Sequence, residues 1–338
     1  MHGKLATCLC ALLLAMPTWA QSAGGAKPAD AVRLQTVTVI GIQPGPGLWK
    51  VSKGGHVMWV LGTLAPLPKH MKWRSTQVEQ AIAQSQELLE PPSAELKMYE
   101  GLFNKLALQP STYSASRNPD GAHLQQILTP EMFARWQALK LQYIGDDSGI
   151  ERRRPILVAM TLYDKALNVA ALTDATDVTD TVMKLARKHD VKRTPVKYQL
   201  MVGASTDAAE TLKQINQRDL GCLDQTMGII EHDMAALTTR ANAWATGDIT
   251  TLRDLSPEGR YDGCLVSVAN ADFAQQLGLE NLPERIEVTW LAAARSALAR
   301  NTQTFAVLPM SQVLSPDGFV AKLKAEGYSV QSPEEQEL

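Results

Sequence analysis

The run Leu48-Trp49-Lys50-Val51, the pair Gly54-Gly55 and the run His56-Val57-Met58-Trp59-Val60-Leu61 together decide the fold of this chain. Both runs are rich in β-branched and aromatic residues, and the glycine pair between them suits a tight turn. The second run ends at Gly62-Thr63. The stretch therefore predicts a β-hairpin that opens a sheet.

A helix and a further strand follow the hairpin. Thr76 and Glu79 have the spacing of a capping box, and Val78 and Ile82 fall on one helical face. A further short strand is predicted at residues 87–90. The N-terminal part of the domain therefore reads as strand, helix, strand.

The C-terminal end repeats this order. Residues 304–308 predict a strand, Ser315-Pro316-Asp317 predicts a helix with proline in its first turn, and Gly327 ends that helix before a strand at 328–330. Each unit must bury one sheet face, so we expect both ends of the chain to build one sheet. The predicted fold class is α/β (α+β), with a mixed central sheet.

The middle of the chain, about 94–300, reads as an inserted helical layer or cap. Thr129-Pro130 begins one helix, and Phe133, Trp136, Leu139 and Tyr143 follow at helical spacing. Further helices are predicted at 155–169, 180–189, 208–217, 224–245 and 282–299. We expect Trp136, Trp244 and Trp290 to lie in the core. The acidic tail, 332–338, should be frayed.

The first twenty residues have the features of a secretory signal peptide. His2 and Lys4 precede an apolar run from Leu5 to Met16, and small residues lead to a cleavage site after Ala20. The apolar run is too short for a permanent anchor, and no second run of about 18 uncharged apolar residues follows it. We therefore expect a periplasmic or secreted protein with no stable transmembrane anchor.

Residues 21–46 predict a flexible or extended segment before the domain that spans 47–331. Within it, Leu34 to Val39 resembles the short box through which TonB-dependent outer-membrane proteins add a strand to a partner. Over the whole chain, 33 Lys and Arg face 35 Asp and Glu, giving a formal net charge of −2. This balance gives no electrostatic reason to bind nucleic acid.

Two cysteines, Cys222 and Cys264, follow the predicted leader. Disulfides persist in exported proteins, and two thiols alone do not make a tetrahedral zinc site, so a single bridge is the preferred interpretation.

The chain resembles the TraB/GumN family, whose relatives include the Tiki metalloproteases. The likeness runs from about Gly47 to Val330, thinly in the helical middle. It rests on Gly47–Val51, Trp59–Leu64, Leu67–Lys69, Trp244–Asp248, Gly318-Phe319, Leu323 and Gly327-Tyr328. The resemblance implies a mixed sheet flanked by helices, with two similar halves that each carry a Gly-x-x-His motif at the sheet's end.

Both motif histidines are replaced in this chain. The first motif reads Gly62-Thr63-Leu64-Ala65, and the matching second stretch reads Leu308-Pro309-Met310-Ser311. The family's acidic position falls on Pro91, while Glu90 beside it should point to the opposite face of its strand. A site without both imidazoles should not hold zinc or manganese tightly.

Two classes of function therefore stay open. The first is a non-catalytic protein of the cell envelope that binds a peptide or protein ligand and needs no cofactor. The second is a metal-dependent hydrolase or peptidase, using zinc or manganese held by replacement ligands. Glu90 and the loop residue His70 are the candidates for such ligands, and Arg154, in a run of three arginines, is a candidate for binding a carboxylate or phosphate. The sequence contains no nucleophile elbow, phosphate loop or dinucleotide motif.

We predict that the mature protein begins at Gln21 and carries a bridge between Cys222 and Cys264. Such a bridge closes a loop of roughly 40 residues and stabilises the fold by about 3 to 4 kcal/mol. Mass spectrometry of the exported protein, with alkylation before and after reduction, measures both features. An intact leader, or two thiols that alkylate without reductant, would contradict the prediction.

Overall fold

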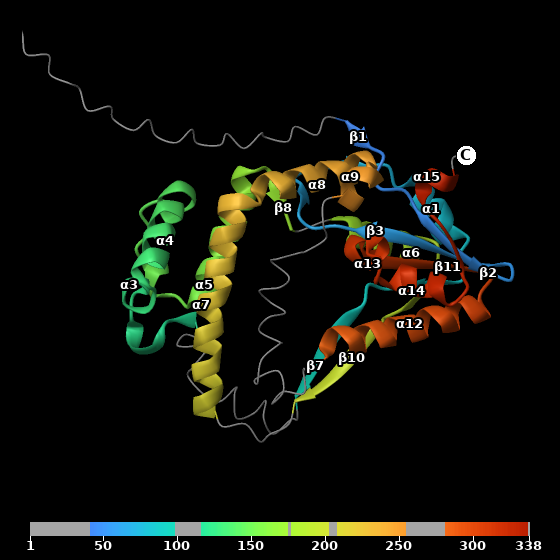
Figure 1. The fold of residues 1–338 in the computed structure, drawn as a ribbon. Helices are drawn as coiled ribbons and strands as arrows, with labels where there is room; N and C mark the ends of the chain where they lie inside the picture. Colours follow the sequence, from blue (N-terminus) through green and yellow to red (C-terminus); the bar gives the residue numbers. More distant parts are fainter. Residues whose placement is uncertain (1–40, 99–115, 175–176, 203–207, 255–280, 337–338) are drawn as a thin grey trace, which may run out of the picture. The chain divides into compact units, whose positions relative to one another are not determined.

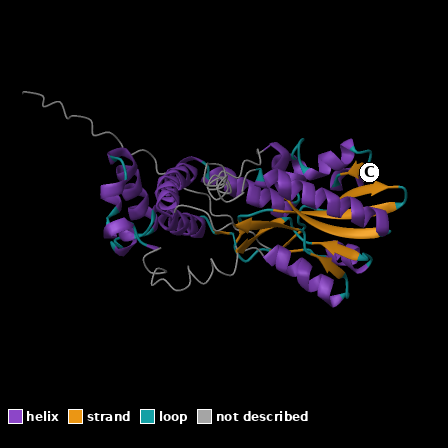
Figure 2. Cartoon of the chain, turned by 90° about the horizontal axis from the view of Figure 1, so that it is seen from below, coloured by secondary structure: helices purple, strands orange, loops and turns teal. Residues whose placement is uncertain are grey.

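The computed structural model describes residues 41–98, 116–174, 177–202, 208–254 and 281–336. A six-stranded sheet, drawn in Figures 1 and 2, organises this part of the chain. Its strands, in spatial order, are β12 (Ser329–Gln331), β2 (Trp49–Lys53), β3 (His56–Thr63), β11 (Gln303–Pro309), β6 (Glu87–Leu89) and β9 (Lys192–Thr194).

The two ends of the chain meet at the centre of this sheet. Strands β3 and β11 pair in parallel from Val57↔Gln303 to Thr63↔Pro309. Strands β6 and β9 continue the parallel half, whereas β2 is antiparallel to β3 and β12 is antiparallel to β2. The prediction of a mixed sheet built from both termini is confirmed.

Helices cover both faces of the sheet (Figure 2). Connections between parallel strands are right-handed. The connections from β3 to β6 and from β6 to β9 run one way along the sheet, so they place α1 (Thr76–Ala83) and α6 (Asp177–Lys188) on one face. The connections into and out of β11 run the other way, so α12 (Leu282–Arg300) and α14 (Phe319–Ala325) cover the opposite face. Fully buried side chains from these layers include Leu61, Ile82, Val182, Trp290, Phe305 and Leu323.

A second hydrophobic core lies among the helices of the middle region. It is built by α4 (Pro130–Tyr143), α5 (Pro155–Val169), α7 (Ala208–His232) and the start of α8 (Met234–Thr246). The residues Ala241 and Trp244 of α8 belong to the helical core and the sheet core respectively, so this helix serves both. Trp136, Trp244 and Trp290 are all 0% exposed, which confirms them as core residues.

Short strand pairs and helices complete the described part of the chain. Three two-stranded sheets join β1 (Ile42–Gln43) to β5 (Lys72–Trp73), β4 (Leu67–Pro68) to β8 (Leu172–Thr173), and β7 (Ser93–Met98) to β10 (Lys197–Val202). The short helices are η2 (Pro119–Gly121), α3 (Leu124–Ile127), η3 (Gly149–Arg152), α9 (Ile249–Asp254), α13 (Met310–Leu314) and α15 (Pro333–Gln336).

The expected capping box of α1 is wrong. The residue before the helix is Ser75, and no side chain caps the helix there. The carboxylate of Glu79 instead accepts hydrogen bonds from Lys188 and His189 of the neighbouring α6 segment, at 2.6 and 2.9 Å. Glu79 therefore forms an ion pair between α1 and the α6 segment instead of a capping hydrogen bond within α1.

The C-terminal unit also differs from its prediction in one place. Ser315-Pro316-Asp317 forms a turn in which the Asp317 N–H donates to Ser315 Oγ, and α14 begins only at Phe319. The short helix α13 occupies the residues directly after β11. The tail forms helix α15, and Gln336 Nε2 donates to the Leu48 carbonyl at 2.8 Å, so this part of the tail is attached rather than frayed.

The middle region is helical in large part but also returns to the sheet. Strand β9 pairs with β6, and β10 pairs with β7. Residues 208–232 form one continuous helix, where two helices at 208–217 and 224–245 were predicted, and α8 is separate.

One buried carboxylate, Glu87 of β6, links the sheet to the end of α12. It accepts hydrogen bonds from Thr194, Lys192, Arg300 and Asn301 while its side chain is only 3% exposed. Burial alone would raise the pKa of Glu87, but these donors outweigh it and lower the pKa from 4.5 to about 2. The ionised form is therefore bound more tightly in the folded protein than in the unfolded chain.

We predict that Glu87→Gln lowers the free energy of unfolding at pH 7 by on the order of 2 to 3 kcal/mol. A depressed pKa stabilises the folded state above pH 4.5, and this stabilisation is lost as the pH falls toward 2. The variant should therefore show a flatter pH dependence in that window. Urea unfolding at a series of pH values measures this.

The control is Glu90→Gln, three residues after Glu87, where the carboxylate lies 3.8 Å from Arg193. This variant should change the free energy of unfolding little. Equal losses in both variants would contradict the argument.

Candidate functional site

The two motif stretches lie side by side, position for position. In the parallel ladder of β3 and β11, Gly62 is the partner of Leu308 and Thr63 is the partner of Pro309. Both strands end here, so Ala65 and Ser311 follow at the same edge of the sheet. Both stretches therefore lie at the end of the sheet, as the family resemblance implies, and the register aligns the first two positions of one motif with those of the other.

Hydrogen bonds hold the two strand ends together. Thr63 Oγ1 donates to the Leu308 carbonyl at 3.2 Å across the pair. The indole Nε1 of Trp244 donates to the Gly62 carbonyl at 2.8 Å. The ring of Trp244 also packs edge-on against Trp73, with centroids 5.8 Å apart. The end of β3 is therefore fixed both by its partner strand and by α8.

Gly62 packs closely against the side chain of Met310. A Cβ atom at this position would lie 2.6 Å from Met310 Cε and 2.7 Å from Met310 Sδ. Met310 is 2% exposed, so its thioether fills the space directly above the glycine. The second stretch has the buried Leu308 at its equivalent position. At this pair of positions, β3 therefore has a glycine and β11 has a buried leucine.

The exposed part of this edge offers hydroxyl and methyl groups. Ala65 is exposed, whereas Thr63 and Ser311 are half-buried. Neither Ala65 nor Ser311 supplies the nitrogen or carboxylate oxygen that binds zinc best. In the described ranges, no three His, Cys, Asp or Glu side chains gather in a way that could hold a metal ion. The motif edge therefore does not fit a tightly bound divalent metal.

The two candidate replacement ligands have other surroundings. Glu90 is half-buried, and its carboxylate lies 3.8 Å from Arg193. Arg193 belongs to β9, the edge strand that β11 and β6 separate from β3. His70 is exposed, in the turn between β4 and β5, with a positive φ of 57°. No contact between either side chain and Ala65 or Ser311 is found among the described residues.

Arg154 is part of an ion pair between helices. Its Nε and Nη2 atoms both lie 2.8 Å from Asp219 Oδ2 of α7, and the Asp219 side chain is only 3% exposed. Burial raises the pKa of Asp219, although Arg154 opposes that shift. The contact joins the start of α5 to α7, so the structure gives Arg154 a role in packing the helical core.

Several sequence predictions lie wholly or partly outside the described residues, among them the signal peptide with its cleavage site after Ala20 and most of the segment 21–46. Cys222 is 3% exposed in α7, but Cys264 falls in an undescribed stretch. The segment Leu34 to Val39 also lies outside. The disulfide and the strand-adding segment therefore stay predictions.

A comparison with models of protein families matches residues 47–332 to the TraB/PrgY/gumN family. The match covers most of the chain and includes both paired stretches. The chain belongs to the TraB/PrgY/gumN family. Searches among curated proteins and among solved structures find no match for it. None of the helices in the described ranges has the length and apolar character needed to cross a membrane.

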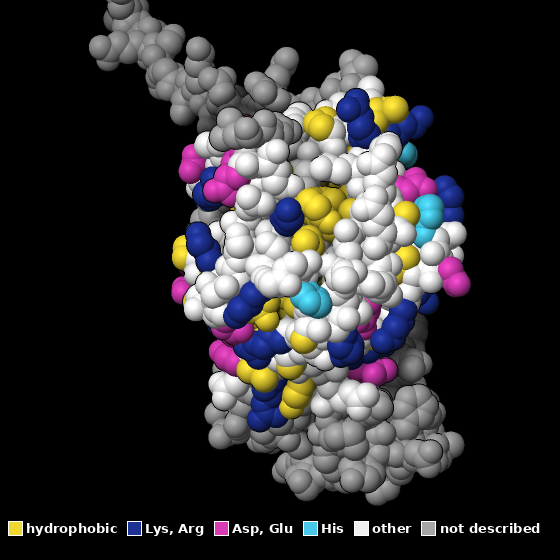
Figure 3. All heavy atoms as spheres, turned by 90° about the vertical axis from the view of Figure 1, so that its right-hand side faces the viewer, with side chains coloured by type: hydrophobic (Ala, Val, Ile, Leu, Met, Phe, Trp, Pro, Cys, Tyr) yellow, Lys and Arg dark blue, Asp and Glu magenta, His cyan; other side chains and the backbone are white. Residues whose placement is uncertain are grey.

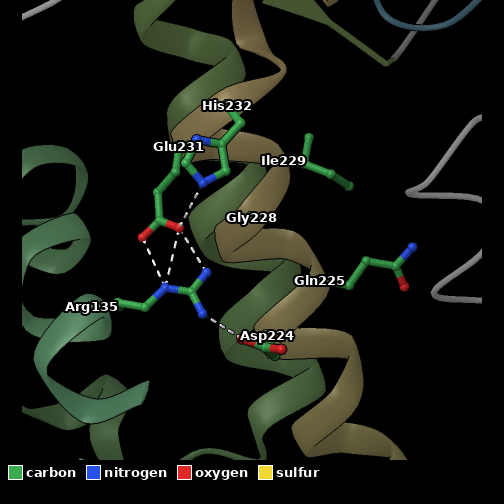
Figure 4. Close-up of a pocket in the computed structure, with 7 residues that line it drawn as sticks. All are labelled: Arg135, Asp224, Gln225, Gly228, Ile229, Glu231 and His232. Atoms are coloured by element: carbon green, nitrogen blue, oxygen red, sulfur yellow. Dashed lines mark hydrogen bonds and ion pairs between the residues drawn. The ribbon is translucent and has the colours of Figure 1, made fainter. Parts of the chain in front are cut away.

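A separate hollow of about 410 Å³ lies on α7 beside α4 (Figure 4). Arg135 of α4 reaches across it, with Nη2 2.7 Å from Glu231 and Nη1 2.5 Å from Asp224. The hydrogen bonds that Arg135 donates to Glu231 and Asp224 hold the pKa of Arg135 above its usual value. Arg135, Glu231 and Asp224 therefore bind one another in the hollow and join α4 to α7. The hollow contains none of the family's motif positions.

Charge does not mark out a site on the face shown in Figure 3. Dark-blue Lys and Arg side chains and magenta Asp and Glu side chains are interspersed there around small hydrophobic patches. This mixture agrees with the near-balanced composition of the chain. The paired motif edge, identified by backbone register rather than by charge, remains the candidate site of this family member.

We predict that Trp244→Phe destabilises the protein by about 1 to 3 kcal/mol more than Trp290→Phe does. Both tryptophans are 0% exposed, belong to the sheet core and contact another aromatic ring. Only Trp244 donates its indole N–H, since Trp290 Nε1 has no hydrogen-bond partner among the described residues. The difference in unfolding free energy therefore isolates the bond to Gly62. Equal destabilisation in denaturant titrations would show that this bond contributes nothing.

Proposed function

We propose that this protein is an exported TraB/PrgY/gumN-family member that binds a peptide or small apolar ligand at the motif edge without metal-dependent catalysis. The observation that carries the proposal is the register of β3 and β11, which ends with Thr63 opposite Pro309, so that Ala65 and Ser311 each follow two residues after this last pair. The resemblance to the family implies a histidine at each of these positions. The chain has a methyl group at one and a hydroxyl group at the other.

Ligand counting supports a non-catalytic role. A tight zinc or manganese site uses three or four well-placed His, Cys or carboxylate ligands. Both imidazoles are replaced, and Glu90, the residue beside the family's acidic position, lies 3.8 Å from Arg193 and would have to leave that partner to bind a metal. Activation of water by a bound metal therefore lacks its donor set at this edge.

The groups that remain suit binding. Leu64 and Met310 are buried beneath the edge, and Thr63 and Ser311 are half-buried with their hydroxyl groups. Mostly apolar surfaces with a few fixed polar groups are typical of ligand sites. Thr63 already donates to the Leu308 carbonyl, so its oxygen keeps lone pairs for an N–H donor of a ligand.

The place of action follows from the leader. We propose export to the periplasm or beyond, with cleavage after Ala20 and a Cys222–Cys264 bridge in the mature protein. The partner is then a peptide or protein of the cell envelope, and nucleic acid is not expected. A TonB-like contact through Leu34 to Val39 is the secondary interaction that the sequence favours.

Metal analysis with a cleavage assay tests the proposal directly. The purified mature protein is loaded with zinc, manganese or cobalt, dialysed, and analysed for metal, and its activity against a peptide library is measured. We expect neither stoichiometric metal nor hydrolysis. Retained metal together with cleavage that Glu90→Ala or His70→Ala abolishes would overturn the proposal and establish a metallopeptidase with replacement ligands.

We further predict that the double variant Ala65→His, Ser311→His binds zinc at least tenfold more tightly than either single variant. Two imidazoles on chain segments that leave the sheet from adjacent strands can share one ion, whereas one imidazole alone binds weakly. Ala65 is exposed and Ser311 is half-buried, so both positions have room for a larger side chain. Calorimetric titration of the two single variants and the double variant measures the effect. Additive, weak binding in the double variant would show that the two positions do not converge.

A further inference from the structure

Strands β7 and β10 form a two-stranded arm that extends the sheet past the motif edge. The chain runs from β6 through Pro91-Pro92 into β7, and from β9 through Pro195 into β10. Both pairs are parallel, with Glu87 opposite Lys192 in the sheet and Ser93 opposite Lys197 in the arm. In Figure 1 the arm runs out beside the start of α12. The arm thus leaves the sheet at the edge where β3 and β11 end.

The position beside β7 is the one that β11 would occupy if it continued. β11 lies next to β6, on the side away from β9. Ala306 pairs with Leu89, so the end of β11 at Pro309 is level with Pro92, one residue before β7 begins. The chain then leaves the sheet into α13. In the described part of the chain, β7 has β10 as its one strand partner.

The outward backbone groups of β7 can be assigned from the ladder. The Ser93 N–H donates to the Val196 carbonyl at 3.0 Å, so Ser93, Glu95 and Lys97 direct their backbone groups toward β10. Alternate residues of a strand point their backbone groups to opposite edges. The N–H and C=O groups of Ala94, Leu96 and Met98 therefore face the side where β11 has ended.

The arm is held in place by α12, so this edge is formed before any ligand arrives. Arg285 of α12 donates to the Tyr198 hydroxyl at 2.6 Å and lies 5.7 Å from the centre of the Tyr198 ring. Among the described residues no strand pairs with this edge of β7, and a preformed strand edge of this kind is a template for one kind of partner, another extended chain. Its geometry specifies main-chain pairing rather than a particular side chain.

We propose that an extended peptide segment of a partner protein adds as a strand to the Ala94–Leu96–Met98 edge of β7, with one end beside Ser311 and Ala65. This inference rests on the proposed function, whose ligand it defines as an unfolded or extended peptide. The opposite edge of the arm, on β10, lies on the side away from β11 and the motif edge. A ligand strand should lack proline at every second position, because alternate N–H groups must donate to β7.

The test begins with an array of synthetic ten-residue peptides bound to the mature, full-length protein. For the strongest binder, each amide is N-methylated in turn. Strand addition predicts that methylation at every second residue weakens binding tenfold or more, and that the residues between tolerate it. Hydrogen exchange should show new protection of the Ala94, Leu96 and Met98 amides in the complex.

Two proline variants provide a matched pair. Ala94→Pro removes an N–H that faces the docking side, whereas Gln199→Pro removes one from the far edge of β10, since Gln199 pairs with Glu95 and directs its backbone groups away from β7. Both residues are exposed. We expect a tenfold or greater loss of peptide affinity in Ala94→Pro and little change in Gln199→Pro.

The outcomes separate this inference from the proposed function. Equal effects of the two variants, N-methyl tolerance without a period of two, or no peptide binding at all would overturn strand addition at β7. The metal analysis would stand unchanged in each of these cases. Conversely, period-two binding together with metal-dependent cleavage of the bound peptide would support docking at β7 and overturn the non-catalytic role.

Discussion

The parallel pairing of β3 with β11 is the constraint on which the rest of the structure depends. It joins residues about 245 positions apart and extends over seven residue pairs at the centre of the sheet. Each neighbouring element takes its place from this pair. β2 and β6 add to its two sides, helices pack on its two faces, and the motif edge is the point where both strands stop. The site exists because one hydrogen-bonded ladder aligns two distant stretches of sequence.

Helix α8 connects this sheet to the helical part of the protein. Its residue Ala241 is buried in the helical core, and Trp244, one turn later, is buried in the sheet core and bonded to Gly62. A rigid helix that belongs to two cores cannot shift in one without disturbing the other, because protein interiors are close-packed. The end of β3 is therefore mechanically coupled to α7 and its neighbours, although none of the helical core residues is a motif residue.

Local sequence patterns predicted the hairpin, the two strand-helix-strand units and several helices, because their signals are local. Thr129 and Pro130 mark the start of α4 through a cap that the structure contains, with Thr129 Oγ1 accepting from Met132. The arm was missed although its signal is present: Tyr198, Leu200 and Val202 alternate along β10, but the long helical patterns around them dominated the interpretation. Two contacts of Gly62 could not be predicted: the hydrogen bond from Trp244 to its carbonyl and the packing of Met310 against it. Both join segments that are distant in sequence, and local sequence patterns carry no information on such contacts. Glu79 shows the same limit. It has the sequence spacing of a capping box, but its carboxylate binds Lys188 on another helix instead of the start of its own helix.

The order of the strands has a consequence for how the chain acquires its structure. β11 is among the last elements to be synthesised, yet it occupies a central place between β3 and β6. Until residues 303–309 arrive, both of these strands keep an unpaired edge, and the β2–β3 hairpin cannot bury its faces. Long-range parallel pairing closes slowly because a large loop must be ordered before its contacts form. In a chain with this topology the facing edges of β3 and β6 stay open until residues 303–309 are available, and these edges are vulnerable to edge-to-edge association if that segment is lost.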